Sequence, residues 1–393
     1  MIKLADKNVC TGCGACAFVC AKQCISMKED ETGCVYPVLD PSSCIECGRC
    51  QNTCPILHAL DVHTPQVAYA AWSNDSSERE TSASGGIAAE IYKYAVAHDY
   101  LIVGAVQQPD FHVEMEVSED ASAIRDFKNS KYVFSEAWHV YPKIKQFLQQ
   151  KKPVVYIGLP CQVAALRKIF RENENLLLIE IVCHGTAPFS YLRQHIECIE
   201  KAKGDKAVRM SFRDPETYTY TYTFTLYNKS GVRFYAETPR KDDTYQYAYH
   251  STISYRENCY QCHFARDKRI ADITLSDYKG LGRLAPCEYG ETNVSSVLVN
   301  TEKGKAFFEK ILEANKIHAD IRPTREPIEG DPQLRQPSMK SAARLDFERL
   351  IKNNDFETAM QIVMKMDKRR KAFRRVWHFP IDVLRSLKRS LVK

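Results

Sequence analysis

Two runs of cysteine near the N-terminus constrain this chain more than any other feature. Residues 10–16 read CTGCGAC and are followed by Cys20, and residues 44–50 read CIECGRC and are followed by Cys54 and Pro55. Three thiolates on a short loop with a fourth cysteine beyond it is the spacing of bacterial two-cluster ferredoxins, in which that fourth cysteine binds the other run's cluster. We therefore predict one 4Fe-4S cluster on Cys10, Cys13, Cys16 and Cys54, and a second on Cys44, Cys47, Cys50 and Cys20.

Zinc sites and disulfides are the alternative uses of so many cysteines. A zinc site commonly joins two separated cysteine pairs and needs no third cysteine at the same short spacing. The segment from Met1 to Val9 lacks the long apolar core of a secretory signal, which argues against disulfides among the 16 cysteines. We therefore expect a reducing, cytoplasmic location.

The 393 residues leave room for two or three domains, and a hydrophobic content of 44% suffices for a sizeable core. The cysteine-rich module is expected to contain a hairpin over residues 25–39 and to end in a linker near residues 60–66. No apolar run approaches the roughly 20 residues of a membrane-spanning helix. The predicted domains are residues 1–60, 66–337 and 338–393, which form an α+β ferredoxin-like module, an α/β core and a helical C-terminal tail.

The core is expected to alternate strands with helices, as α/β proteins do. Strands are predicted at residues 101–106, 153–158 and 176–182, and the last two are followed by Cys161 and Cys183. The carboxyl ends of neighbouring parallel strands lie side by side on the ligand-binding edge of a sheet. We therefore expect these two thiols to meet in space.

A further pair of cysteines, Cys259 and Cys262, lies on a predicted loop. With Cys161 and Cys183 the pair completes a set of four, the number that a third 4Fe-4S cluster needs. Two alternatives remain open at this point. Cys161 could be a reactive thiol at a helix N-terminus, and the CxxC pair could bind zinc.

A glycine pair precedes the helix predicted at residues 87–97. Ser84 is expected to cap that helix, and Gly85 and Gly86 would let its backbone N–H groups approach an anion such as the phosphate of a flavin. The alternative is a glycine-rich turn in a compact core.

These motifs occur in an order that resembles the family of coenzyme F420 hydrogenase/dehydrogenase beta subunits. The resemblance covers about residues 1–335 and implies an α/β flavoprotein core that binds FAD and one 4Fe-4S cluster, the latter on Cys161, Cys183, Cys259 and Cys262. The segments that carry it are Ser84-Gly-Gly86, Ser130-Lys-Tyr132, Gly158-Leu-Pro-Cys161-Gln162, Cys183-His-Gly185, Cys259-Tyr-Gln-Cys262 and residues 271–277.

The resemblance also implies where the flavin binds. Lys131 would contact a carbonyl or phosphate of the cofactor, although Lys131 and Tyr132 could equally form an ordinary half-buried pair. FMN in place of FAD also remains open. The implied flavin residues are Ser84, Gly85, Gly86, Ser130, Lys131, Tyr132, Asn293, Val294, Ser295 and Ser296.

The chain departs from common family patterns at two places. Ala21 stands where a proline often follows the first run, and residues 276–280 read SDYKG where GDFWG is frequent. The second departure lies near the expected active site and leaves the substrate open. His184 is a candidate proton donor there, against the alternative of a loop histidine bonded to the backbone.

Two further expectations concern residues outside these motifs. Residues 217–226 alternate threonine with aromatic residues, and this alternation predicts a hairpin with residues 232–237 that has one aromatic face. That face is expected to pack on the core or, alternatively, to cover the flavin or a planar substrate. The unassigned cysteines are expected to be small buried hydrophobic residues: Cys24, Cys34, Cys198 and Cys287.

The tail carries the positive charge of the chain. Residues 365–393 contain eleven Lys or Arg and two Asp, so the net charge of +6 becomes negative over the first 364 residues. A basic helix with Val383, Leu384, Leu387 and Leu391 on one side could bind an anionic membrane surface, where each basic residue contributes roughly 1 kcal/mol. Binding to a partner protein and folding back on the domain are the alternatives.

The sequence thus predicts an iron-sulfur flavoprotein oxidoreductase. Clusters carry single electrons and a flavin exchanges two, so the chain would link a soluble carrier or partner subunit to a small organic substrate, with coenzyme F420 the first candidate. The alternative is an electron-transfer subunit without its own substrate. The direction of electron flow and the formation of a homo-oligomer remain open, and no region predicts nucleic-acid binding.

Overall fold

The computed structural model describes residues 2–239 and 243–390, with side chains as far as Phe373. Its first part is a small module of two antiparallel strands, β1 (Ile25–Glu29) and β2 (Val35–Leu39), and two short helices, α1 (Ala15–Phe18) and α2 (Arg49–Asn52). Gly14 and Gly48 precede the two helices with the same positive φ of 73°, so each cysteine loop turns in the same way. The predicted hairpin is confirmed.

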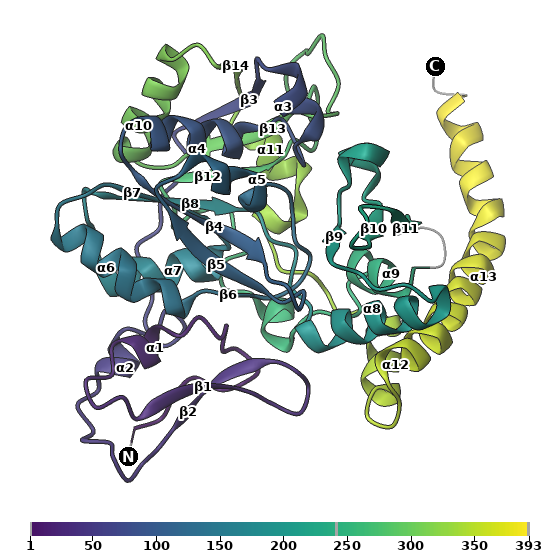
Figure 1. Ribbon diagram of the computed structural model, residues 1–393. Coiled ribbons are helices and arrows are strands. Elements are labelled where there is room, and N and C mark those ends of the chain that lie inside the picture. The colour runs from purple at the N-terminus through teal and green to yellow at the C-terminus, as the bar shows by residue number, and fades with distance from the viewer. Residues whose placement is uncertain (1, 240–242, 391–393) are drawn as a thin grey trace.

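A mixed sheet of nine strands forms the centre of the molecule (Figure 1). The strand order is β14-β3-β13-β12-β8-β7-β4-β5-β6, and β12, β8, β7 and β4 run parallel. The strands predicted near residues 101, 153 and 176 are confirmed as β4, β7 and β8. The bounds are β3 (Val67–Ser73), β4 (Leu101–Gln107), β5 (Val113–Ser118), β6 (Ser135–Glu136), β7 (Val154–Gly158), β8 (Leu176–Ile181), β12 (Ile273–Asp277), β13 (Ser295–Val299) and β14 (Ile317–Arg322).

Helices cover both faces of this sheet (Figure 1). One face packs against α4 (Ile87–Ala97) and α10 (Glu302–Glu313), and the other packs against α6 (Tyr141–Gln149) and α7 (Pro160–Phe170). Each face therefore has its own hydrophobic core, which explains why the central strands are apolar throughout. The core also contains shorter helices: α3 (Ser76–Thr81), α5 (Ile124–Phe127) and α11 (Arg325–Gly330).

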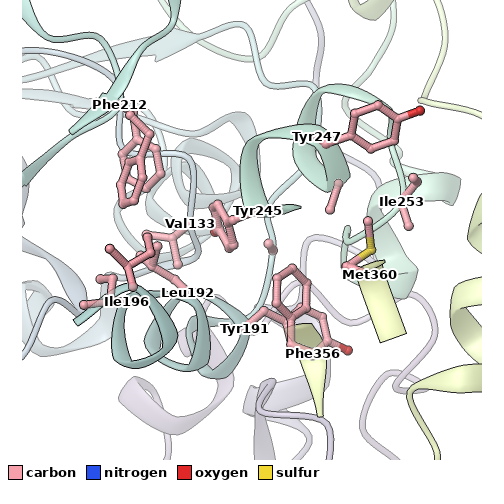
Figure 2. Close-up of a cluster of buried hydrophobic side chains, with 14 of the residues drawn as sticks. Val133, Tyr191, Leu192, Ile196, Phe212, Tyr245, Tyr247, Ile253, Phe356 and Met360 are labelled. Atoms are coloured by element: carbon pink, nitrogen blue, oxygen red, sulfur yellow. The ribbon is translucent and has the colours of Figure 1, made fainter. Parts of the chain in front are cut away.

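A third hydrophobic core lies beside the sheet (Figure 2). Three short strands, β9 (Arg209–Ser211), β10 (Phe224–Tyr227) and β11 (Arg233–Glu237), lie next to helices α8 (Phe189–Lys203), α9 (Thr244–His250), α12 (Ala342–Leu350) and α13 (Phe356–Ser390). Phe347, Phe356 and Met360 are fully buried in this core. The segment expected as a tail thus begins inside a packed core.

The end of α13 is described by its backbone alone. The predicted apolar side of the tail falls on Val383, Leu384, Leu387 and Leu391, whose side chains lie outside the described part of the chain. Membrane binding by this segment stays a prediction. Among the described residues, no helix is both long and apolar enough to cross a membrane.

The predicted aromatic hairpin is confirmed only in its second half. Strand β10 begins at Phe224, and the residues before it form two 3₁₀ turns, Pro215–Thr217 and Thr219–Thr221. Tyr218 and Tyr220 point to solvent with 66% and 49% of their surface exposed, so the prediction of a single aromatic face is wrong. The physical reason is local, because the hydroxyl of Thr221 donates to the carbonyl of Thr217 and competes with strand pairing.

Candidate functional site

The ferredoxin cysteines line two separate small cavities. Cys10, Cys13, Cys16 and Cys54 surround the first, and Cys20, Cys44, Cys47 and Cys50 surround the second, with Cys50 also touching the first. Each cavity thus contains three cysteines of one run and the last cysteine of the other run, in agreement with the predicted exchange. We call these cavities the inner ferredoxin site and the outer ferredoxin site. The binding roles of the individual cysteines remain predictions.

The unassigned cysteines do not behave alike. Cys24 and Cys34 are buried, as expected. Cys24 lines the outer ferredoxin site as a fifth thiol, with its Sγ 3.3 Å from Cys20 Sγ. Cys287 is only half-buried. The prediction is wrong for Cys198, which is exposed on α8 because helix periodicity turns its side chain away from the core.

The four predicted core cysteines come together. Cys161 is in the first turn of α7, directly after β7, and Cys183 follows β8, its parallel neighbour. Cys259 and Cys262 come from the 3₁₀ turn Glu257–Gln261 and the residue after it. All four line one cavity of about 40 Å³, which we call the core site. The prediction that Cys161 and Cys183 meet is therefore confirmed.

The donor set of the core site suits an iron-sulfur cluster. Its thiols lie deep enough that burial raises the pKa of each one, and the other cysteines raise the pKa of Cys161 further. Bound metal reverses such shifts, because coordinated thiols are deprotonated. Within the described residues, no three His, Cys, Asp or Glu side chains converge closely enough for a single metal ion. Four soft thiol donors around one cavity fit an iron-sulfur cluster.

A cavity of about 490 Å³ lies over the carboxyl ends of β7, β8 and β12. This is the edge of an α/β sheet where ligands bind. The cavity is large enough for part of a flavin. Six predicted flavin residues line it, namely Ser84, Gly86, Ser130, Lys131, Tyr132 and Ser295. The four others do not line it: Gly85, Asn293, Val294 and Ser296.

The glycine turn at the N-terminal end of α4 is tightly packed. Gly85 has no room for a side chain, since a Cβ atom would lie 2.4 Å from the carbonyl oxygen of Ala71. Its N–H donates to Ser295 Oγ at 2.9 Å. The prediction that Ser84 caps α4 is wrong: Gly86 is the N-cap with φ 85°, and the Ser84 hydroxyl donates to the carbonyl of Val294. The turn is therefore anchored to β13, and the first N–H groups of α4 have no side-chain cap.

Lys131 is held by backbone carbonyls in this conformation. Its Nζ donates to the carbonyl oxygens of Asp126 at 2.7 Å and Lys128 at 2.9 Å, at the end of α5. Burial lowers the pKa of Lys131 to about 7. Contact between Lys131 and a carbonyl or phosphate of the flavin stays a prediction. Tyr132 stacks on Tyr249 with ring centroids 4.7 Å apart and forms an aromatic wall of the cavity.

Polar residues occupy one end of the cavity, and two of them, Arg213 and His250, were not singled out from the sequence. Arg213 forms an ion pair with Asp277 at 2.9 Å, and Tyr222 donates to the same carboxylate at 3.1 Å. Burial, together with electrostatic repulsion from neighbouring basic groups such as Arg213, lowers the pKa of His250 to about 4. The sequence carried one signal for this region, the departure at residues 276–280, since Ser276, Asp277 and Lys279 line the cavity.

His184 lies within this polar end. Its Nε2 is 3.2 Å from Lys279 Nζ and 3.7 Å from Asp331 Oδ2. Burial raises the pKa of Asp331, but the hydrogen bond from His184 and the charge of Lys279 outweigh it and lower the value to about 2. Asp331 is thus an anion, and its negative charge favours a proton on His184 or on Lys279.

The core site and the large cavity share a wall. Cys183, His184, Gly185 and Thr186 line both of them, together with Leu159. Gly185 has a φ of 142°, and a Cβ atom there would lie 2.3 Å from the ring of Tyr255. The segment after β8 therefore passes between the two sites without room for larger residues.

The chain matches known proteins over both of its cysteine-containing parts. Residues 9–56 match the 4Fe-4S dicluster domain, and residues 151–323 match the family described as the C terminus of the coenzyme F420 hydrogenase/dehydrogenase beta subunit. Residues 151–323 belong to that family. The resemblance inferred from the sequence is thereby confirmed for these two regions. The matches leave the flavin and the core cluster as predictions.

Two curated relatives extend over most of the chain. An F(420)H(2) dehydrogenase subunit of Methanosarcina mazei is 23% identical over 91% of this chain and 97% of its own length. An uncharacterized protein of Methanocaldococcus jannaschii is 21% identical over 85% and 95%. Among solved structures, a chain of the F420-reducing [NiFe] hydrogenase complex from Methanosarcina barkeri is 18% identical, covers 79% of this chain and 94% of its own, and gives a TM-score of 0.44.

Proposed function

We propose that this chain is an iron-sulfur flavoprotein oxidoreductase that joins a one-electron partner to a small organic substrate. Clusters at the two ferredoxin sites and the core site would supply single-electron transfer, and a flavin in the large cavity would supply hydride transfer. The observation that carries the proposal is the shared wall, because Cys183 and the three residues after it line both the core site and the cavity.

The chain's own side chains divide the cavity between two tasks. Gly85 and Gly86 leave the first N–H groups of α4 open to an anionic group of the cofactor. At the polar end, His184 is the residue we assign to proton transfer, since Lys279 and Asp331 lie within reach of its ring. The Arg213–Asp277 ion pair lies in the same polar end and would orient the substrate.

The substrate class follows in part from the relatives. The printed name of the Methanosarcina mazei relative refers to reduced coenzyme F420, which makes that coenzyme the first substrate to assay. Lys279 and Arg213, each paired with a carboxylate, would donate hydrogen bonds to an anionic substrate at the polar end. The SDYKG sequence in this region distinguishes the chain from common members, so other planar redox substrates belong in the same assay.

Composition is the first test of the proposal. Anaerobic purification should yield about twelve irons and twelve sulfides per chain together with one flavin, the sum expected for three 4Fe-4S clusters. Fewer than about eight irons, or no flavin, would refute it. The chain reduced through its clusters should then turn over a substrate alone. Turnover only in the presence of a partner would favour the alternative, an electron-transfer subunit without its own substrate.

A glycine substitution tests the position of the flavin. In Gly85→Ala the new methyl group would overlap the Ala71 carbonyl, so the turn must shift. We expect the purified variant to keep its iron and to lose most of its flavin absorbance. Gly290→Ala is the matched control, because a Cβ there meets nothing within 4 Å. Full flavin content in Gly85→Ala would place the cofactor elsewhere.

A further inference from the structure

Arg256 differs from the other buried arginines of the described chain. Arg167, Arg213, Arg269 and Arg344 are also buried, and each forms an ion pair with at least one carboxylate. Arg256 is only 2% exposed, yet within residues 2–239 and 243–373 no Asp or Glu forms an ion pair with it. A buried charge without a counter-charge is strongly destabilising. No carboxylate of the described residues therefore provides the counter-charge of this guanidinium.

The guanidinium of Arg256 lies between the ferredoxin module and the core. Its Nη1 donates to the carbonyl of Thr11 at 2.8 Å, and its Nη2 donates to the carbonyl of Val35 at 3.3 Å. Its Cζ is 4.2 Å from the centre of the Phe134 ring. The Nε is buried without a hydrogen-bond partner. These contacts orient the group but leave its charge uncompensated.

The acidic groups around Arg256 are thiols and one phenol. Cys34, Tyr36, Cys259 and Cys161 are its electrostatic neighbours, and its charge opposes the effect of burial on the pKa of Cys10 and of Cys259. Cys10 belongs to the inner ferredoxin site, and Cys161 and Cys259 belong to the core site. Burial raises the pKa of Tyr36, so this phenol stays neutral. Arg256 thus faces cysteines of two sites at once.

We propose that Arg256 is a positioning residue that compensates the negative charge of the inner ferredoxin cluster and the core cluster together and sets their reduction potentials. The inference rests on the proposed function, since it requires both clusters. Four thiolates give an oxidised 4Fe-4S cluster a net negative charge, and one-electron reduction adds one more. An electron that leaves one cluster for the other therefore remains beside the same guanidinium.

Redox titrations followed by electron paramagnetic resonance test this proposal. Arg256→Gln removes the charge and should make reduction of both clusters about tenfold less favourable at a given potential, a shift of about 59 mV to lower potential for one electron. The outer ferredoxin cluster should keep its potential. Arg256→Lys keeps the charge and should show no such shift. Arg167→Gln is the matched control, because that buried arginine pairs with Asp272 and Glu172 instead of facing cysteines.

The possible outcomes separate the inference from the proposed function. Full iron content with unshifted potentials in Arg256→Gln overturns the inference, and so does an equal shift in Arg167→Gln. If Arg256→Gln cannot hold its iron, Arg256→Lys decides the question: full iron with unshifted potentials supports the proposal, and lost iron contradicts it. A wild-type chain with fewer than about eight irons would refute the proposed function itself.

Discussion

The ferredoxin module and the core site both gather four cysteines around a small cavity, but they do so in different ways. At the inner and outer ferredoxin sites three of the four cysteines come from one loop of seven residues. At the core site the cysteines come from the start of α7, the end of β8 and a 3₁₀ turn more than seventy residues later. The first arrangement is a property of a loop, and the second is a property of the whole sheet.

The difference teaches where each site can exchange electrons. Cys47 is exposed, and the large apolar side chain of Ile45 beside it has 61% of its surface exposed. The outer ferredoxin site is therefore accessible from the surface of the molecule. The core site lies beneath the ferredoxin module and borders the large cavity. The order outer, inner and core thus follows the direction from the surface to the cavity.

Removing one cysteine from each region gives the largest expected effect. Cys183→Ser should lower the iron content from about twelve to about eight per chain and prevent reduction of the flavin through the clusters. Cys47→Ser should lose a similar amount of iron from the outer ferredoxin site. Iron analysis and paramagnetic resonance distinguish the two. Cys198→Ser is the control, since this cysteine is exposed and lines neither kind of site. An unchanged iron content in Cys183→Ser would contradict the prediction of a cluster at the core site.

The accessibility of the sites predicts the order of iron loss. With a chelator and a mild oxidant, iron should leave in at least two phases, because Cys47 is open to solvent and the core site is covered. The slow phase should correspond to about four irons and should be absent in Cys183→Ser. The loss of iron is followed by the absorbance of the chelate. A single phase would mean that the core site is as accessible as the outer one.

The contact between the two regions predicts the smallest effect. The hydroxyl of Tyr141, which is fully buried, donates to the carbonyl of Cys13 at 2.8 Å. Tyr141→Phe leaves that carbonyl without its donor, so the free energy of unfolding should fall by about 1 kcal/mol with no loss of iron. Chemical denaturation of the holoprotein measures this change in the free energy of unfolding. Tyr220→Phe, at an exposed position, should leave the free energy of unfolding unchanged. An equal loss of stability in Tyr220→Phe would show that the Tyr141–Cys13 hydrogen bond is not the cause.

The sequence predicted those features that depend on local spacing. The cysteine runs, the hairpin at residues 25–39 and the strands that lead to Cys161 and Cys183 required only motif spacing and hydrophobic pattern. The prediction that Ser84 caps α4 was wrong because the Ser84 hydroxyl binds the carbonyl of Val294 beside β13, a strand some two hundred residues away. Arg213, His250 and Asp331 were missed for the same reason, since single polar residues carry no signal until the sheet brings them together.

The segment after β8 also limits how such a chain can diversify. Residues 183–186 line the core site on one side and the large cavity on the other, so a mutation there alters both at once. A new substrate preference gained at this wall would disturb the redox properties in the same step. We therefore expect related chains to adapt to new substrates at residues that line the large cavity but not the core site, such as Asp277 and Lys279, where a change leaves the four cysteines untouched.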